Sequence, residues 1–143
     1  MSSPIIYPEI PSFREALKKA VKRTQLDRAY LKDCVVLSDG RLWVSYRGEQ
    51  LGVNDWRVFD ELVRRVDGRF DSPCTVSCQE VCLALGLTSF EMFKQILIRL
   101  RTGVVRIHRE KYEAAFNVLS ECRWVDGELN YFISAQAAQL LRA

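Results

Sequence analysis

Two short amphipathic segments follow one another between residues 77 and 103, and only Gly86-Leu87-Thr88 separates them. Residues that begin or end helices stand at their limits: Ser77 and Thr88 or Ser89 at the starts, Gly86 and Gly103 at the ends. The second segment, residues 88–102, spaces its apolar residues as a helix does, at Phe90, Phe93, Ile96, Leu97 and Leu100. Two helices joined by so short a turn predict a helix-turn-helix unit.

After Gly103 the apolar pattern changes from helical spacing to alternation. Residues 104–108 predict a short strand and residues 109–111 a turn. The alternation then predicts one long strand that presents a single apolar face, made of Tyr112, Ala114, Phe116, Val118, Ser120, Cys122 and Trp124. Asp126-Gly127 favours a tight hairpin turn into residues 129–133. We therefore expect an antiparallel β wing, closed by a last helix over residues 135–142.

Upstream of this unit, the proline-punctuated residues 4–11 predict an extended segment. Residues 12–15 have the form of a capping box, which predicts a basic amphipathic helix that ends between Thr24 and Leu31. Residues 34–46 predict a β-hairpin that turns at Asp39-Gly40.

A further helix is expected to be capped by Asn54 or Asp55 and to end at Gly68, with an apolar stripe of Trp56, Phe59, Leu62, Val63 and Val66. A short extended piece, residues 74–76, precedes the helix-turn-helix. Helix, short strand, helix, helix and antiparallel strands is the order of a winged helix. The predicted fold is α+β: a winged-helix domain over residues 33–143 that includes the β-hairpin, preceded by a basic helical arm over residues 1–32.

The residues offer no constellation for catalysis. The chain has one histidine, His108, whereas nucleophile relays need a base beside a serine or cysteine and helical zinc sites need a histidine pair. Phosphate-binding glycine loops and the Gly-x-Ser-x-Gly elbow are absent. The acids scatter over helix faces and do not converge. We expect a protein that binds and is not an enzyme, with no catalytic residue and no cofactor.

The five cysteines also favour a structural role. Cys74, Cys78 and Cys82 recur every four residues, which differs from the paired spacing of zinc sites. Cys78 and Cys82 share a helical stripe with Leu85, as small buried residues do. An odd number of cysteines and a start without signal-peptide character indicate thiols in the cytoplasm. We therefore expect no metal site and no membrane attachment.

Positive charge is concentrated in two stretches, although the net charge of the chain is only +3. Residues 1–32 hold seven basic residues against three acids, and residues 94–111 hold six against one. Two basic patches on a neutral body can form a nucleic-acid footprint, and they can equally be two solvated faces.

The candidate DNA-binding residues come from these two stretches. They are Lys94, Gln95, Arg99 and Arg101 on the second helix of the helix-turn-helix, Arg106 and Arg109 in the wing, and Lys18, Lys19 and Lys22 on the N-terminal helix. Glu91 would repel phosphate and Ile98 would be an exposed apolar residue, which is more natural at a protein contact. This helix is therefore a mediocre candidate for reading bases.

From Tyr46 onward the sequence resembles the first winged-helix domain of TrfA-type plasmid replication initiators. The resemblance rests on Tyr46-Arg-Gly-Glu49-x-Leu51-x3-Asp55-x2-Val58, on the turn at Leu85-Gly86 and on Leu97 to Leu100. It continues through Phe116-Asn-Val-Leu119, Gly127, Ile133-Ser-Ala and Leu140-Leu141.

The resemblance implies a first domain that supplies dimerisation and auxiliary contacts to double-stranded DNA at origin repeats, together with host replication proteins as partners. Such initiators carry a second winged helix as the main reader of bases, and a counterpart is not found in these 143 residues. Ile98 and the β face are the expected dimer surface. Two alternatives stay open: a winged-helix transcription regulator that binds an operator as a dimer, and a winged-helix module that binds only proteins.

Overall fold

The computed structural model describes residues 13–24, 30–38 and 40–142. Its elements follow the chain in this order: α1 (Phe13–Thr24), β1 (Tyr30–Ser38), β2 (Trp43–Glu49), α2 (Val53–Val66), β3 (Cys74–Ser77), α3 (Cys78–Leu85), α4 (Phe90–Thr102), β4 (Val104–Arg109), β5 (Tyr112–Asn117), β6 (Glu121–Val125), β7 (Glu128–Phe132) and α5 (Ala135–Leu141). The fold is α+β, as expected. Ser12 and Asp39, expected in a cap and a turn, lie outside the described residues, as do residues 4–11.

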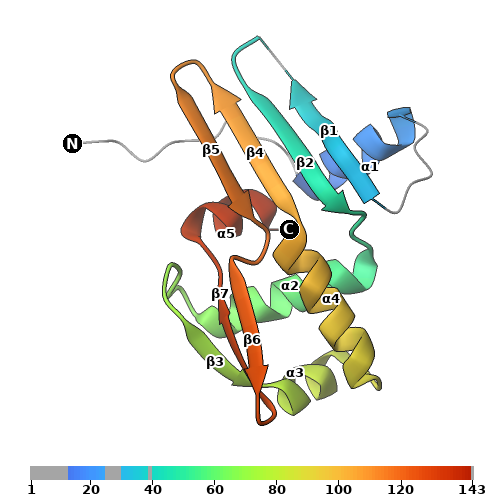
Figure 1. The fold of residues 1–143 in the computed structure, drawn as a ribbon, viewed down its shortest axis with the longest axis vertical. Helices are drawn as coiled ribbons and strands as arrows, with labels where there is room; N and C mark the ends of the chain where they lie inside the picture. Colours follow the sequence, from blue (N-terminus) through green and yellow to red (C-terminus); the bar gives the residue numbers. More distant parts are fainter. Residues whose placement is uncertain (1–12, 25–29, 39, 143) are drawn as a thin grey trace.

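Two antiparallel sheets divide the elements into two parts (Figure 1). The larger sheet has the order β1-β2-β4-β5, so that the expected hairpin of β1 and β2 is extended by the two strands that follow α4. The smaller sheet has the order β3-β7-β6 and lies beside α2, α3 and α4. The expected domain boundary between residues 32 and 33 falls inside β1.

The local signals around the helix-turn-helix are confirmed. Ser77 and Ser89 cap α3 and α4, because each hydroxyl accepts a hydrogen bond from a backbone N–H three residues later. Gly86 ends α3 in the left-handed conformation. Asp126 and Gly127 both have positive φ, as a tight turn between β6 and β7 requires.

The expected limits of α2 are wrong at both ends. Gly52 is the N-cap, and Asp55 lies three residues into the helix, where its carboxylate accepts a hydrogen bond from the Gly52 N–H at 2.6 Å. This is the reciprocal half of a capping box, which leaves Asn54 without a capping role. At the other end Asp67, and not Gly68, takes the first left-handed position.

The single long strand expected from Tyr112 to Trp124 is also wrong. β5 ends at Asn117, and residues 118–120 cross to the other sheet before β6 begins. Val118 and Leu119 are both buried at this crossing, and their N–H groups donate to the carbonyls of Gly103 and Leu100. β4 pairs with β2 instead of with the β6–β7 hairpin, so residues 104–117 belong to the larger sheet.

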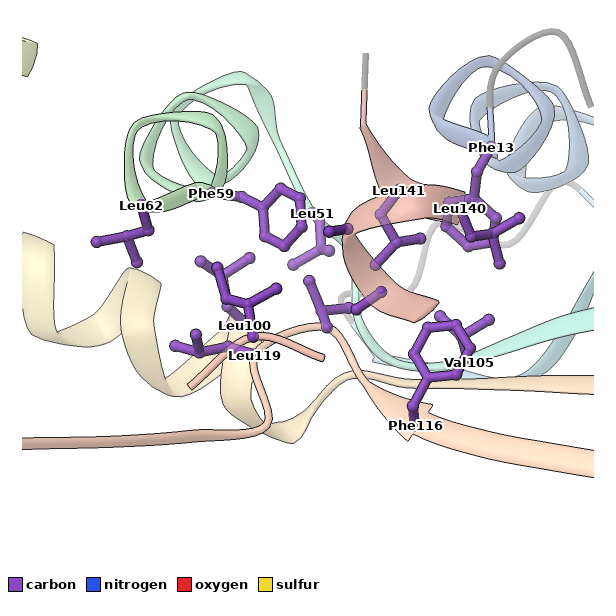
Figure 2. Close-up of a cluster of buried hydrophobic side chains, with 14 of the residues drawn as sticks. Phe13, Leu51, Phe59, Leu62, Leu100, Val105, Phe116, Leu119, Leu140 and Leu141 are labelled. Carbon is purple, nitrogen blue, oxygen red and sulfur yellow. The ribbon is translucent and has the colours of Figure 1, made fainter. Parts of the chain in front are cut away.

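One apolar core joins the two parts (Figure 2). Phe13 of α1 and Leu140 of α5 lie near Val105 and Phe116 of the larger sheet. Further side chains carry the cluster into the other part, at Leu51, Phe59, Leu62, Leu100 and Leu119. Phe90, expected in this core, is instead 43% exposed at the first turn of α4.

The junction between α4 and β4 depends on close contact with Tyr46. The Tyr46 hydroxyl donates to the carbonyl of Glu49 at 2.6 Å, and its ring is fully buried. A Cβ atom at Gly103 would lie 2.8 Å from that hydroxyl oxygen. Glycine at residue 103 therefore lets the chain leave α4 directly into the larger sheet.

Candidate nucleic-acid interface

The larger sheet has two different faces. α1 packs on β1 and α5 on β5, and these helices cover the face that carries Val44, Tyr46, Val105 and Ile107. Because side chains alternate along a strand, the residues between them point the other way. We call this second face the outer face. Its central members are Trp43, Ser45 and Arg47 of β2, Arg106 and His108 of β4, and Glu113 and Ala115 of β5.

Two exposed arginines lie next to each other on the outer face. Arg47 is opposite Val104 in the register, and Arg106 is two residues further along β4. This diagonal relationship separates the two residues by about 7–8 Å. A hydrogen bond to Tyr30, with the charges of Tyr30 and Asp33, raises the pKa of the Arg47 guanidinium.

The end of α4 borders the same face. The Asn117 side chain, opposite Val104 on the outer face, donates to the carbonyl of Arg101 at 2.8 Å. Arg101 is exposed, and its charge acts on the Cys122 thiol of β6, so its side chain lies where the outer face meets the smaller sheet. We call Arg47, Arg101 and Arg106 the arginine stripe. Arg109, also exposed, lies at the far end of β4 opposite Tyr112.

Arg99, one of the expected DNA contacts, is engaged inside the protein. Its guanidinium donates to the Oδ1 atom of Asp55 from Nε at 3.0 Å and from Nη2 at 2.8 Å. The Asp55 side chain is only 6% exposed and that of Arg99 is 27% exposed. The sequence suggested an outward-facing arginine, and the structure places it as the link between α4 and the first turn of α2.

Lys94 and Gln95 occupy the first half of α4. The Lys94 ammonium lies 4.8 Å from the centre of the Phe90 ring and 5.7 Å from that of Trp124 on β6. Cation–π contacts of this kind hold the lysine against the β6–β7 hairpin. Gln95 is exposed, and so is Ile98, as expected.

The candidate lysines of α1 lie on the opposite side of the sheet. Phe13, Leu17 and Ala20 bury one side of α1 against the core, which leaves Lys18, Lys19 and Lys22 exposed on the other. Because α1 covers the core face, the sheet stands between these lysines and the arginine stripe (Figure 1). The structure therefore divides the expected residues into two separate surfaces.

Sequence reasoning missed Arg47 as a candidate. The alternation of Trp43, Ser45 and Arg47 places it on a predictable side of its strand. Its neighbour Arg106 is almost sixty residues away in the chain, so the pairing of β2 with β4 carries the information. A strand pairing over that distance has no local sequence signal.

The cysteines and His108 were the remaining candidates for chemistry. Burial raises the pKa of the thiols of Cys78, Cys82 and Cys122, which disfavours the reactive thiolate. Among the residues that the structure describes, no group of three or more histidine, cysteine or acidic side chains is placed to hold a metal. His108 lies 2.8 Å from Glu113 on the exposed sheet surface.

No single helix in the described part of the chain is long and apolar enough to cross a membrane. α3 and α4 reach the required length and apolar composition only when taken together, and the two helices are bent by 96° relative to each other.

Comparison with known proteins identifies a similar fold and no sequence relative. No protein-family model matches the chain, and no curated protein matches it. The crystal structure of RctB domains 2-3 (RctB-155-483) matches with a TM-score of 0.57 over 78% of this chain, at 10% sequence identity. The match covers 53% of the RctB fragment, so this chain spans about half of its length. The fold of this chain is therefore similar to that of RctB domains 2-3.

Proposed function

We propose that this chain is a winged-helix domain of a replication initiator, which self-associates and makes auxiliary contacts to double-stranded DNA without catalysing a reaction. The observation that carries this proposal is the fold match to RctB, a plasmid or chromosome replication initiator. A TrfA-type initiator is the finer form of the proposal, and its resemblance rests on the short motifs from Tyr46 onward. Such a domain would work in the cytoplasm at origin repeats, beside host replication proteins.

The winged-helix part of the proposal is supported by topology. The elements α2, β3, α3, α4, β6 and β7 have the order helix, strand, two helices and two strands, with β4 and β5, expected in the wing, inserted between α4 and β6. β3 pairs with β7, which pairs with β6, so the short strand before the helix-turn-helix completes the sheet of the hairpin after it. The β6–β7 hairpin then corresponds to the wing, and the larger sheet is an addition to it.

The proposed DNA contacts centre on the arginine stripe. Arg47, Arg101 and Arg106 are exposed and border one face, which suits the neutralisation of neighbouring phosphates. We propose that Arg109 on β4 and Gln95 on α4 make further contacts to DNA. Arg99 and Lys94 are held by Asp55 and by two aromatic rings, so we assign them a supporting role in positioning α4.

This distribution favours backbone contact over base reading. The exposed part of α4 includes Glu91 and Ile98, which offer a major groove neither phosphate contacts nor donors for bases. A regulator that reads an operator through α4 is therefore the weaker alternative. A module that binds only proteins is the other alternative, and the arginine stripe argues against it.

Self-association is proposed through Ile98 and the β1 edge of the larger sheet, which borders the outer face. Tyr30 and Val35 of β1 expose apolar surface at the border of that face, and Ile98 is 42% exposed on α4. A two-fold arrangement would bring the same patch of both copies together. Exposed apolar side chains are the composition expected at the centre of such an interface, and the arginine stripe beside them is left to the DNA contacts.

Fluorescence anisotropy with a labelled random-sequence duplex, measured over a range of salt concentrations, tests the DNA contacts. We expect binding at low salt that weakens steeply as salt rises and changes little with sequence. Absence of low-salt binding would contradict both DNA functions. Strong preference for one selected sequence would instead support the operator reader.

Light scattering over a range of protein concentrations tests self-association separately. We expect the mass to rise from one chain toward two. A constant single-chain mass at the highest concentration would contradict the dimer without affecting the DNA result.

A further inference from the structure

A hollow of about 640 Å³ lies between α3, the α3–α4 turn and the turn that joins β6 to β7. Its apolar lining comes from Cys82, Leu83, Leu87 and Phe90. Asp126 and Glu128 line it from the hairpin turn. The hollow is distinct from the arginine stripe, which lies at the opposite end of α4.

The apolar lining is unusually open to solvent. Leu83 is 72% exposed and Phe90 is 43% exposed, although both belong to helices whose other faces are well packed. Large apolar side chains gathered at a concave surface are typical of a binding site for another molecule. Single exposed apolar residues are ordinary, but two of them at one hollow require a reason.

Backbone hydrogen bonds fix the positions of the segments that line the hollow. The N–H of Cys78 donates to the carbonyl of Gly127 at 3.0 Å, which ties the start of α3 to the hairpin turn. The N–H of Leu87 donates to the carbonyl of Cys82 at 2.8 Å, which fixes the α3–α4 turn. A partner would therefore meet a preformed surface, and binding would cost little ordering of this chain.

Two acidic side chains line the hollow, and two more lie in the helices that form it. Asp126 and Glu128 line it, Glu80 lies on the same helix as Leu83, and Glu91 follows Phe90 directly. The ammonium of Lys94 rests on the Phe90 ring, and Arg65 reaches Glu80 only at 3.8 Å. The charged side chains that line the hollow, Asp126 and Glu128, are both carboxylates, whereas Lys94, Arg65 and Arg57, which donates to the Leu85 carbonyl at 2.8 Å, are not among its lining residues. The potential at the lining therefore favours a cationic ligand over a phosphate backbone.

We infer that this hollow binds a cationic segment of a partner protein that carries one or two large apolar side chains. The apolar side chains would enter between Leu83 and Phe90, and lysines or arginines around them would face Asp126, Glu128 and Glu91. This arrangement places a protein contact where a helix-turn-helix would otherwise present itself to DNA. It does not depend on the DNA contacts proposed above, because those use the other end of α4.

A labelled peptide with two leucines one helical turn apart, surrounded by lysines, is the probe for this inference. Its binding to the full chain is measured by fluorescence anisotropy at moderate salt. We expect Leu83→Gln to weaken binding about tenfold and Glu128→Gln to weaken it several-fold. A peptide with glutamate in place of lysine, or serine in place of leucine, should not bind.

Two matched control variants distinguish binding at this hollow from nonspecific binding of the peptide. Val53→Gln removes an apolar side chain that is 78% exposed at the start of α2, and Glu121→Gln removes an exposed acid at the other end of the β6–β7 hairpin. Both should bind the peptide as the unaltered chain does. All four variants are first compared by circular dichroism, and Leu83→Gln should fold normally because Leu83 is exposed.

Three results would overturn the inference. The first is equal peptide affinity for Leu83→Gln and the unaltered chain. The second is an equal loss in the Val53→Gln control. The third is a loss of duplex affinity in Leu83→Gln, which would make the hollow part of the DNA interface. Unchanged duplex binding together with weakened peptide binding is the result that supports it.

Discussion

Asp55 and Arg99 join the first turn of α2 to the last turn of α4 through two hydrogen bonds to one carboxylate oxygen, at 2.8 and 3.0 Å. The other oxygen of Asp55 accepts the N–H of Gly52, so one nearly buried carboxylate serves both as a helix cap and as an interhelical contact. This pair fixes where α4 leaves the helical part of the molecule. It also explains why Arg99, which a helical projection places on the outer side of α4, is turned toward α2.

The Asp55–Arg99 pair is expected to be strongly coupled. Asp55→Asn and Arg99→Met should each lower the free energy of unfolding by about 3 kcal/mol. The first leaves the Arg99 guanidinium without its carboxylate, and the second leaves the nearly buried Asp55 carboxylate without its guanidinium. The double variant should lose clearly less than the two losses added together. Urea denaturation followed by circular dichroism measures all four proteins.

Arg64→Met provides the comparison for that cycle. It removes the contact of an exposed guanidinium with Glu61, which Arg65 still contacts at 2.8 Å, and should change the stability far less than either variant of the cycle. Additive losses for Asp55→Asn and Arg99→Met would show that the two residues act independently, against the contact described here.

Gly103 and Tyr46 form the second structural relationship that can be tested. Gly103→Ala places a methyl group 2.8 Å from the Tyr46 hydroxyl oxygen and 3.1 Å from its Cε2 atom, while the backbone at φ −70° accepts alanine. We expect a loss of about 1–3 kcal/mol from overpacking. In the Tyr46→Phe background the hydroxyl is absent, so the same alanine should cost less. Equal costs in both backgrounds, measured by thermal unfolding, would contradict this contact.

Tyr131 should make stability depend on alkaline pH. Its hydroxyl donates to the carbonyl of Leu62 at 2.7 Å, and burial followed by a hydrogen bond to Cys74 raises its pKa. The folded state keeps the phenol neutral, whereas the unfolded chain releases the proton near pH 10. This stabilisation is therefore complete below about pH 10 and is lost as pH rises above it.

Tyr131→Phe isolates that contribution from the titration of lysines. At neutral pH the variant should be about 1 kcal/mol less stable, because the hydrogen bond is lost. Between about pH 10 and pH 11 its urea midpoint should fall less steeply than that of the unaltered chain. Parallel curves for the two proteins would exclude the assigned titration.

Short-range chemistry made much of the fold predictable from the sequence. The helix caps at Ser77, Ser89 and Gly86 each involve contacts within one helical turn. The turn at Asp126-Gly127 depends only on the positive φ angles of these two residues. The two helices of the helix-turn-helix and the β6–β7 turn were therefore located correctly. These signals require no knowledge of what packs against them.

The larger sheet and its outer face could not be located in this way. The alternation of apolar residues predicts a strand that continues through residues 118–120. Val118 and Leu119 are nevertheless both buried, because the chain passes there from one sheet to the other. The pairing of β2 with β4 depends on tertiary contacts and not on neighbouring residues. The capture of Arg99 by Asp55 is likewise a contact across 44 positions, so a helical projection alone placed Arg99 outward.

Salt-dependent duplex binding of paired variants tests whether the arginine stripe contacts DNA. Arg47→Gln with Arg106→Gln removes two exposed charges from the outer face, whereas Lys18→Gln with Lys22→Gln removes two from α1 on the other side of the sheet. We expect the arginine pair to lower low-salt affinity and to reduce the slope of log affinity against log salt by about two, while the lysine pair changes both only slightly. Equal affinities and slopes for the arginine pair and the unaltered chain would contradict this contact.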